Sequence, residues 1–464
     1  MSSTPSPLLT QLQQRPNAPF IFLPTQVLSY QDVANRVSSL INQLEQHSLP
    51  QGSRIGWVST TPLHGILLQL ACLHGGWVYC AISPHLRAEQ YQSALKTLAL
   101  DAIISPTQIP HVTAIDINWE SATNQPSIPS SLPLARWVDL VLTSGSSGQP
   151  KAVIHSWQNL YFSALGSNQL IPITPADCWL ASLPLFHVGG QALIWRALLA
   201  GASIAISSPI LANDLTQYPI SHLSLVPTQL YRLLNTREFS HRHLRLRHIL
   251  VGGGPCNEQQ LKRCDQRGFI AYMSYGSSEM SSQVSTRRVG EGRGAGQLLA
   301  YRQLRLQDGE ILLRGETLSP GYFNAGRIQS LLDSDGWFHS GDCGQWQGEQ
   351  LVVLGRRDHR FICGGENIHP EEIEMALLNH PEVTAAIVIA QPDAEYGMRP
   401  VAFIQSNTTI GLTQLEVFLQ PKLSAFKRPV RYFTLPQQAG LKVQRQTLIN
   451  ILNQPTDCSI AEIL

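Results

Sequence analysis

The sequence predicts an α/β fold, with a large N-terminal α/β domain followed by a small C-terminal α+β domain. Short apolar runs alternate with helical patterns over most of the 464 residues, as they do when helices cover buried sheets. The length is about three times that of a typical domain. A change of texture near Gly355 divides the chain into predicted domains 1–355 and 356–464.

Several apolar runs in the first part are predicted to be strands. They are 103–104, 138–142, Ser203–Ile206 and His248–Val251. Between Trp157 and Leu165, apolar side chains recur at i, i+3, i+4, i+7 and i+8, which predicts an amphipathic helix. The polar, proline-containing segment 118–135 is predicted to be a surface connection.

The region after Gly355 has the elements of a compact unit. A helix is predicted to begin at Pro370, because proline suits the first helical position, where its missing N–H is not needed. Strands are predicted at 384–390, 401–405 and 431–435, and a second helix from Thr413. A unit of about 110 residues is a plausible small domain.

Charge and composition exclude several classes of protein. Lys and Arg number 33 against 32 Asp and Glu, a net charge of +1, which gives no electrostatic case for binding nucleic acid or acidic lipid. The apolar stretch 66–82 is interrupted by polar residues and glycines, so no membrane span is expected. The polar N-terminus lacks a signal-peptide core. The eight cysteines show no zinc spacing. We expect a cytoplasmic protein with reduced thiols, and a homo-oligomer stays open.

The most informative stretch is a loop at 143–151 that follows the predicted strand 138–142. Its small residues are Thr143, Ser144, Gly145, Ser146, Ser147 and Gly148, and it ends in Lys151. Such a loop can turn backbone N–H groups and hydroxyls around an anion, so phosphate is the predicted ligand. An ordinary surface turn also favours Ser and Gly. A Walker loop needs Ser or Thr directly after the lysine, and Ala152 stands there.

Further motifs follow in a fixed order. They are Tyr275, Gly276, Ser277, Ser278 and Glu279; Ser340, Gly341 and Asp342; 355–358 with 364–368 and 372–374; and Lys442 near the C-terminus. With the loop 143–151, they make the chain resemble the adenylate-forming superfamily of acyl- and aryl-CoA ligases, carrier-loading adenylation domains and luciferases. The resemblance covers nearly the whole chain. It implies ATP, Mg²⁺ and coenzyme A, a large N-terminal domain of several subdomains, and a mobile C-terminal domain.

The resemblance assigns residues to the phosphates and ribose of ATP. Adenylation brings a carboxylate against the α-phosphate, two anions that repel each other and need shielding. Thr143 and Lys151 would grip the departing pyrophosphate, and Glu279 would hold Mg²⁺, which takes carboxylate ligands. Asp342 would accept hydrogen bonds from both ribose hydroxyls, with support from Arg356.

Other residues would surround the adenine. Tyr275 would stack on the base, next to Gly276 and Ser278 of the same motif. The turn with Gly253 and Gly254 would allow close backbone approach. Ser277 and Ser278 precede Glu279 at two positions where the family has a different pair of residues. The second of these positions keeps a hydroxyl group.

The C-terminal domain would serve both half-reactions. Lys442 would bridge the substrate carboxylate and the α-phosphate, a role carried by the motif alone, because most lysines are exposed and solvated. Asp358 resembles the hinge residue of such enzymes, and an ordinary turn residue is the alternative. In the second orientation, the loop with Gly364 and Gly365 would open a path for pantetheine.

A narrower resemblance concerns the acid. Segments 182–191, 194–196, 199–202, 224–230 and 441–446 are similar to the 2-succinylbenzoate–CoA ligases of menaquinone biosynthesis. Burying an unpaired guanidinium is costly, so Arg196 would pair with the second carboxylate of a dicarboxylic acid. A surface arginine in an ion pair is the alternative. His187 would gate the acid pocket, with a satisfied core histidine as the alternative, and Thr228 would contact the acid.

The sequence therefore predicts an AMP-forming acid–thiol ligase that makes 2-succinylbenzoyl-CoA through an acyl-AMP. Within the same class, another acid or a carrier protein could be the substrate. In a different class, a non-catalytic acyl-AMP or nucleotide sensor would have lost Lys442 or Glu279, and both are present.

Overall fold

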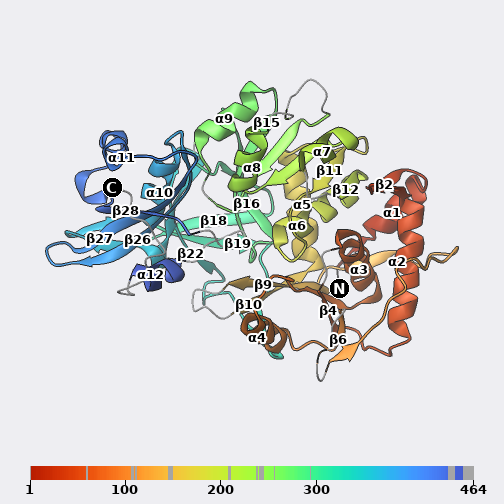
Figure 1. The fold of residues 1–464 in the computed structure, drawn as a ribbon. Helices are drawn as coiled ribbons and strands as arrows, with labels where there is room; N and C mark the ends of the chain where they lie inside the picture. Colours follow the sequence, from red (N-terminus) through yellow and green to blue (C-terminus); the bar gives the residue numbers. More distant parts are fainter. Residues whose placement is uncertain are drawn as a thin grey trace.

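The computed structural model describes residues 2–58, 61–105, 109, 112–144, 150–206, 211–236, 239, 245–254, 256–292, 294–436 and 445–452. The strands of these residues form five sheets. In Figure 1 the blue C-terminal elements gather at one end of the molecule, and the red N-terminal helices lie at the other. The fold is α/β, as the sequence predicts.

Two large sheets carry most of the chain. The first, here the N-terminal sheet, has the order β21 (Arg327–Gln329), β20 (Tyr322–Asn324), β10 (Pro150–Ser156), β9 (Trp137–Ser144), β5 (Val78–Ala81), β4 (Arg54–Trp57), β6 (Ala102–Ile104), β7 (Thr113–Ala114). The second, the central sheet, has the order β17 (Gln297–Leu298), β16 (Ser282–Arg288), β15 (Ile270–Ser277), β14 (His248–Val251), β13 (His222–Leu225), β11 (Cys178–Ala181), β12 (Ser203–Ile206), β2 (Pro19–Phe22), β3 (Val27–Ser29).

Three smaller sheets complete the fold. One has the order β18 (Arg302–Gln307), β19 (Glu310–Gly315), β22 (Phe338–Gln347), β23 (Gln350–Arg356). The C-terminal sheet has the order β25 (Glu366–Ile368), β24 (Phe361–Cys363), β27 (Gly397–Ser406), β26 (Val383–Asp393), with β28 (Arg431–Thr434) on β27. The third pairs β1 (Ser3–Pro5) with β8 (Ser131–Pro133).

The helices lie between these strands in the chain. They are α1 (Pro7–Gln14), α2 (Tyr30–Glu45), α3 (Pro62–Gly75), α4 (Ala88–Leu98), α5 (Trp157–Leu170), α6 (Val188–Ala200), α7 (Leu211–Gln217), α8 (Pro227–Leu234), α9 (Glu258–Gln266), α10 (Pro370–Leu378), α11 (Leu412–Leu419) and α12 (Arg445–Leu452), with short 3₁₀ turns η2 (Arg357–His359) and η3 (Ala425–Lys427).

Local chemistry fixes where α5 begins. The Ser156 Oγ accepts a hydrogen bond from the Asn159 backbone N–H, and Asn159 Oδ1 accepts from the Ser156 N–H at 2.9 Å. This capping box satisfies helix N–H groups that would otherwise lack partners. It stops β10 at Ser156, so the strand leads directly from the predicted phosphate loop into a partly buried helix.

The largest core lies where the two large sheets and their helices meet. Leu67 of α3, Trp157 of α5 and Trp195 of α6 are almost completely buried in this cluster. Burying a large apolar side chain contributes about 1.5–3 kcal/mol. Separate apolar clusters fill the C-terminal part on both sides of its sheet.

Most predicted elements are confirmed, and one is wrong in part. β12 and β14 coincide with the predicted strands, and α10 begins at Pro370. The segment 118–135 is not connection throughout, because residues 131–133 form β8. Its partner β1 lies near the N-terminus, far from β8 in the sequence, so no local pattern could reveal the pairing.

The cysteines of the described ranges are free and buried, whereas Cys458 falls outside those ranges. No helix in the described part of the chain is long and apolar enough to cross a membrane.

Two buried histidines should make stability sensitive to acid. Burial lowers the pKa of His74 and His222 to about 4 each, so both are neutral in the folded state at neutral pH. Their stabilising contribution is present above the unfolded-state pKa of about 6.5 and is lost as the pH falls through the folded-state value. We expect the free energy of unfolding to fall between these two pH values, and to fall less steeply in His74→Gln. Urea denaturation at several pH values measures both slopes, and equal slopes would contradict a neutral His74.

Candidate active site

The carboxyl ends of neighbouring parallel strands define one edge of the central sheet. β11, β13, β14 and β15 run parallel side by side. The segments that follow them are 182–187, 226–228, 252–254 and 278–279. Because ligands of open α/β sheets bind outside the carboxyl ends of the strands, this edge is the candidate active site. It holds predicted residues from four separate stretches of sequence.

Glu279 and Lys151 meet at a tyrosine. The Tyr322 hydroxyl donates to Glu279 Oε1 at 2.7 Å, and Lys151 Nζ lies 4.9 Å from the Tyr322 ring centroid. Thr143 pairs with Lys151 across the β9–β10 hairpin. Burial, together with the Glu279 carboxylate, raises the pKa of Tyr322, so its hydroxyl stays protonated and donates. A cation, a hydroxyl and a carboxylate thus border one site.

This residue set fits a magnesium ion that arrives with a nucleotide. Within the described residues, no group of three or more His, Cys, Asp or Glu side chains could hold a metal ion. Mg²⁺ is commonly held by one or two carboxylates together with substrate phosphates and waters. Glu279 beside the cationic hairpin meets that requirement.

Part of the predicted phosphate loop is outside the described residues. Ser144 ends β9 and Pro150 begins β10, so the predicted strand 138–142 is confirmed, whereas both ends of the predicted loop 143–151 belong to strands. Gly145, Ser146, Ser147 and Gly148 lie in the gap between them. Lys442 also lies outside the described residues. Their roles remain predictions.

The residues predicted for the ribose are linked to one another. Asp342 Oδ2 accepts a hydrogen bond from the Tyr275 hydroxyl at 2.6 Å, and its Oδ1 lies 3.4 Å from Arg356 Nη1. Arg356 Nε donates to Asp358 Oδ1 at 3.1 Å. Burial raises the pKa of Asp342, while Tyr275 and Arg356 oppose that rise. The residues predicted for the adenine, the ribose and the hinge are therefore connected by side-chain contacts.

Gly276 is required by a close backbone approach. A Cβ at this position would lie 2.0 Å from the Ser282 carbonyl oxygen, so no other residue fits without moving the backbone. The tight turn that follows places Ser278 and Glu279 at the end of β15. This explains why a glycine stands between the tyrosine and the serines of the motif.

Within the described ranges, Arg196 is a buried cation without an acidic partner. Its side chain is 1% exposed, and its Nη2 donates to Ser282 Oγ at 3.2 Å. Its guanidinium lies 5.4 Å from the Trp179 ring centroid, and burial lowers its pKa to about 9. No carboxylate of the described residues pairs with it, and its Nε has no partner among them. The alternative of a surface arginine in an ion pair is therefore wrong.

The remaining predicted residues lie at the edge with open surroundings. His187 precedes α6 and is exposed, with its ring 4.7 Å from that of Phe186, so a satisfied core histidine is wrong. Thr228 is exposed in the first turn of α8. Gly253 has a φ of +81°, and a Cβ on Gly254 would meet nothing within 4 Å. The backbone of this turn is open to a ligand.

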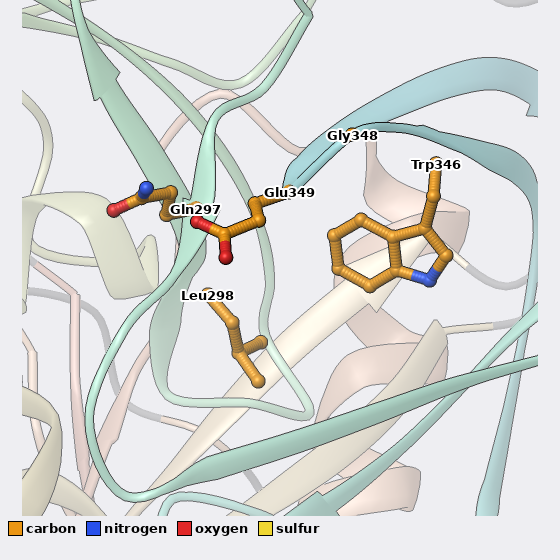
Figure 2. A pocket seen from close by; sticks show the side chains of 5 residues that line it. All are labelled: Gln297, Leu298, Trp346, Gly348 and Glu349. Atoms are coloured by element: carbon orange, nitrogen blue, oxygen red, sulfur yellow. The ribbon is translucent and has the colours of Figure 1, made fainter.

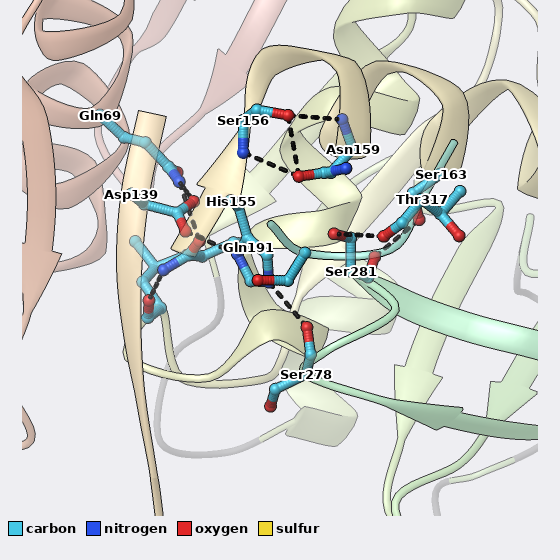
Figure 3. Close-up of polar contacts among 12 residues, drawn as sticks. Gln69, Asp139, His155, Ser156, Asn159, Ser163, Gln191, Ser278, Ser281 and Thr317 are labelled. Atoms are coloured by element: carbon cyan, nitrogen blue, oxygen red, sulfur yellow. Dashed lines mark hydrogen bonds and ion pairs between the residues drawn. The ribbon is translucent and has the colours of Figure 1, made fainter. Parts of the chain in front are cut away.

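Sequence reasoning missed residues that contact the predicted ones. Tyr322 and Ser282 are described above. His155 lies between Asp139 Oδ1, at 2.6 Å, and the Ser278 carbonyl oxygen, at 2.7 Å, as Figure 3 shows. The position of His155 four residues after Lys151 gives no signal of either contact, because both partners are distant in sequence.

The hollow in Figure 2 is a different surface. It has a volume of about 550 Å³ and is lined by Gln297, Leu298, Trp346, Gly348 and Glu349. It lies on β17 and on the hairpin that joins β22 to β23. None of its lining residues belongs to the predicted site, so it takes no part in the arrangement described above.

Tyr322 provides a test of this geometry. In Tyr322→Phe the ring remains beside Lys151, but Glu279 loses the hydroxyl that orients it. Because partners that orient a metal-binding carboxylate typically change affinity by 10–100-fold, we expect MgATP to bind about 10-fold more weakly. Titration calorimetry measures the change, with Trp346→Phe as the control. An unchanged affinity in Tyr322→Phe would show that the hydroxyl does not position Glu279.

Comparisons with known proteins show the family to which this chain belongs. Residues 8–323 match the AMP-binding enzyme family, and residues 372–438 match the AMP-binding enzyme C-terminal domain. The 2-succinylbenzoate–CoA ligase of Haemophilus influenzae is 32% identical over 432 residues, covering 92% of this chain and 93% of the relative. An Escherichia coli MenE variant with bound OSB-AMS has a TM-score of 0.87 at 29% identity, covering 97% of this chain and 99% of that one. The Bacillus subtilis o-succinylbenzoate CoA synthetase with ATP and magnesium has a TM-score of 0.83 at 26% identity, covering 94% and 96%. The chain belongs to the AMP-binding enzyme family and, within it, to the 2-succinylbenzoate–CoA ligases.

Proposed function

We propose that this chain is an ATP-dependent ligase that converts 2-succinylbenzoate to its CoA thioester in menaquinone biosynthesis. The acid first attacks the α-phosphate of ATP, forming acyl-AMP and releasing pyrophosphate. The thiol of coenzyme A then attacks the acyl carbon, and AMP leaves. The observation that carries the acid's identity is the buried guanidinium of Arg196, which has no carboxylate partner among the described residues.

The phosphate end of the site supplies positive charge and a metal ligand. Lys151 and Thr143 bind the β- and γ-phosphates, which leave as pyrophosphate. Glu279 holds the Mg²⁺ that comes with ATP. These groups are fixed before the reaction, because Tyr322 contacts both Lys151 and Glu279. Preorganised charge of this kind stabilises a transition state at little cost in reorganisation.

The nucleoside end uses the linked residues of the ribose site. Tyr275 stacks on adenine, beside Gly276, Ser278 and the turn at 253–254. Asp342 accepts hydrogen bonds from the ribose hydroxyls, and Arg356 supports it. Their mutual hydrogen bonds hold these side chains in place.

The C-terminal domain, residues 356–464, turns about Asp358 relative to domain 1–355. Lys442 neutralises the substrate carboxylate and the α-phosphate in the first half-reaction. After rotation the loop at 364–365 lines the path of the thiol. The enzyme works in the cytoplasm on small molecules.

The acid end recognises the second carboxylate. A buried guanidinium without a counter-ion is unfavourable, and an anion that pairs with it removes much of that penalty. The dicarboxylate supplies this anion, and Arg196 presents its planar donors to it. His187 and Thr228 border the entrance on the exposed side of the edge.

Formation of the thioester tests the function directly. Purified protein with ATP, Mg²⁺, coenzyme A and 2-succinylbenzoate is expected to yield 2-succinylbenzoyl-CoA, AMP and pyrophosphate in equal amounts, detected by chromatography and mass spectrometry. Omission of coenzyme A leaves acyl-AMP as the product. Turnover of other acids but not this one would refute the assignment of the substrate.

Replacement of Arg196 tests recognition of the second carboxylate. A hydrogen bond to a charged group contributes about 1.5–3 kcal/mol, so Arg196→Gln is expected to raise the KM for 2-succinylbenzoate about 10–100-fold. An analogue of 2-succinylbenzoate that lacks the carboxylate on the ring should give similar KM values with the wild type and with Arg196→Gln. Pyrophosphate release gives the rates, and an equal loss with both acids would show that Arg196 only supports the fold.

A further inference from the structure

We propose that His155 is a positioning residue that fixes the magnesium-binding Glu279 by holding the carbonyl group of the residue before it. The proposal rests on the proposed function of Glu279 in adenylation. His155 Nε2 lies 2.7 Å from the Ser278 carbonyl oxygen, and Nδ1 lies 2.6 Å from Asp139 Oδ1. A carbonyl oxygen and a carboxylate oxygen are both acceptors, so both ring nitrogens must donate.

The pair is completely enclosed. Asp139 and His155 are each 0% exposed. A buried ion pair with good geometry is costly to break, because removing one partner leaves an uncompensated charge. The direction of the imidazole is therefore fixed by β9 and β10, the strands of the hairpin that also holds Thr143 and Lys151.

The segment that His155 holds is under backbone strain. Ser281 and Ser282 have φ values of +54° and +110°, a region that non-glycine residues rarely adopt. Such conformations persist only where the surroundings over-determine them. Besides His155, the Ser163 hydroxyl donates to the Ser281 carbonyl at 2.6 Å, and the Ser319 N–H donates to the Glu279 carbonyl at 2.7 Å. Figure 3 shows how His155 and Ser163 approach this turn from neighbouring elements.

The pair of Asp139 and His155 is also connected to the segment 182–187, which is predicted to border the acid. Gln69 Nε2 lies 3.3 Å from Asp139 Oδ2 and 3.0 Å from Gln191 Oε1. Gln191 Nε2 donates to the Leu185 carbonyl at 2.9 Å, in the segment that ends at His187. All of these polar side chains are 0% exposed. One buried network therefore joins the β9–β10 hairpin, the backbone carbonyl that precedes Glu279 and the segment 182–187.

A purely structural role and a positioning role predict different measurements. Loss of general stability would affect both half-reactions and would leave the magnesium requirement of adenylation unchanged. Displacement of Glu279 would weaken the use of Mg²⁺ in adenylation. It would spare thioester formation from preformed acyl-AMP, which needs no ATP.

The experiment compares His155→Gln and Asp139→Asn with the wild type. Exchange of pyrophosphate into ATP is measured with 2-succinylbenzoate over a range of free Mg²⁺, and transfer of preformed acyl-AMP to coenzyme A is measured separately. Because outer partners of a metal ligand typically contribute 10–100-fold, we expect about 10-fold more Mg²⁺ to be needed for half-maximal exchange. The transfer rate should be unchanged.

The matched control is His74→Gln. His74 is another buried histidine with two hydrogen-bond partners, the Ser6 hydroxyl and the Leu70 carbonyl, and lies in α3. Its replacement should leave the magnesium dependence of exchange unchanged. A shift of the same size in His74→Gln would overturn the proposal, as would equal loss of both half-reactions in His155→Gln.

The remaining outcomes are also decisive. If His155→Gln does not fold, Asp139→Asn decides alone, because it keeps the side-chain volume and removes the charge. If neither variant folds, the pair is a folding determinant and the proposal fails. Absence of exchange in the wild type refutes the proposed function, whereas normal wild-type exchange with an unshifted magnesium dependence in the variants overturns this inference alone.

Discussion

The parallel pairing of β11, β13, β14 and β15 is the constraint on which the site depends. Each strand of a parallel set ends at the same edge, and a crossover must return the chain to the opposite edge before the next strand begins. The loops after these strands therefore converge, although they are far apart in the sequence. Glu279, Thr228, His187 and the glycine turn share one edge for this reason alone.

Two buried arginines near this edge differ in how their donors are satisfied. Arg196 and Arg302 are both buried, and neither pairs with a carboxylate of the described residues. Arg302 is satisfied by carbonyl oxygens, those of Gln283 at 2.8 Å and Ala300 at 2.7 Å. Arg196 has fewer partners, because its Nε has none in the described part of the chain. An anionic ligand would complete the coordination of Arg196, whereas Arg302 needs none.

The residues predicted to bind the ribose are in contact with the predicted hinge residue. Asp342 is engaged by Tyr275 on one oxygen and approached by Arg356 at the other, and Arg356 also contacts Asp358. A nucleotide that binds Asp342 must fit into this arrangement or replace part of it. Because a ligand shifts an equilibrium only through contacts that differ between states, these contacts connect the predicted nucleotide site with Asp358, the predicted hinge residue.

The sequence by itself determined the fold class, several strands and the residues that carry chemical groups. Apolar periodicity is local, and so are the loop at 143–151 and the motifs around Glu279 and Asp342. The tertiary structure alone decided that Tyr322 contacts Glu279, 43 residues away, and that His155 holds Ser278, 123 residues away. It also decided that Arg196 is buried with no carboxylate partner in the part of the chain that the structure describes. These facts depend on which strands become neighbours and which helix faces they cover, and sheet order is set by long-range packing that no short window of sequence encodes.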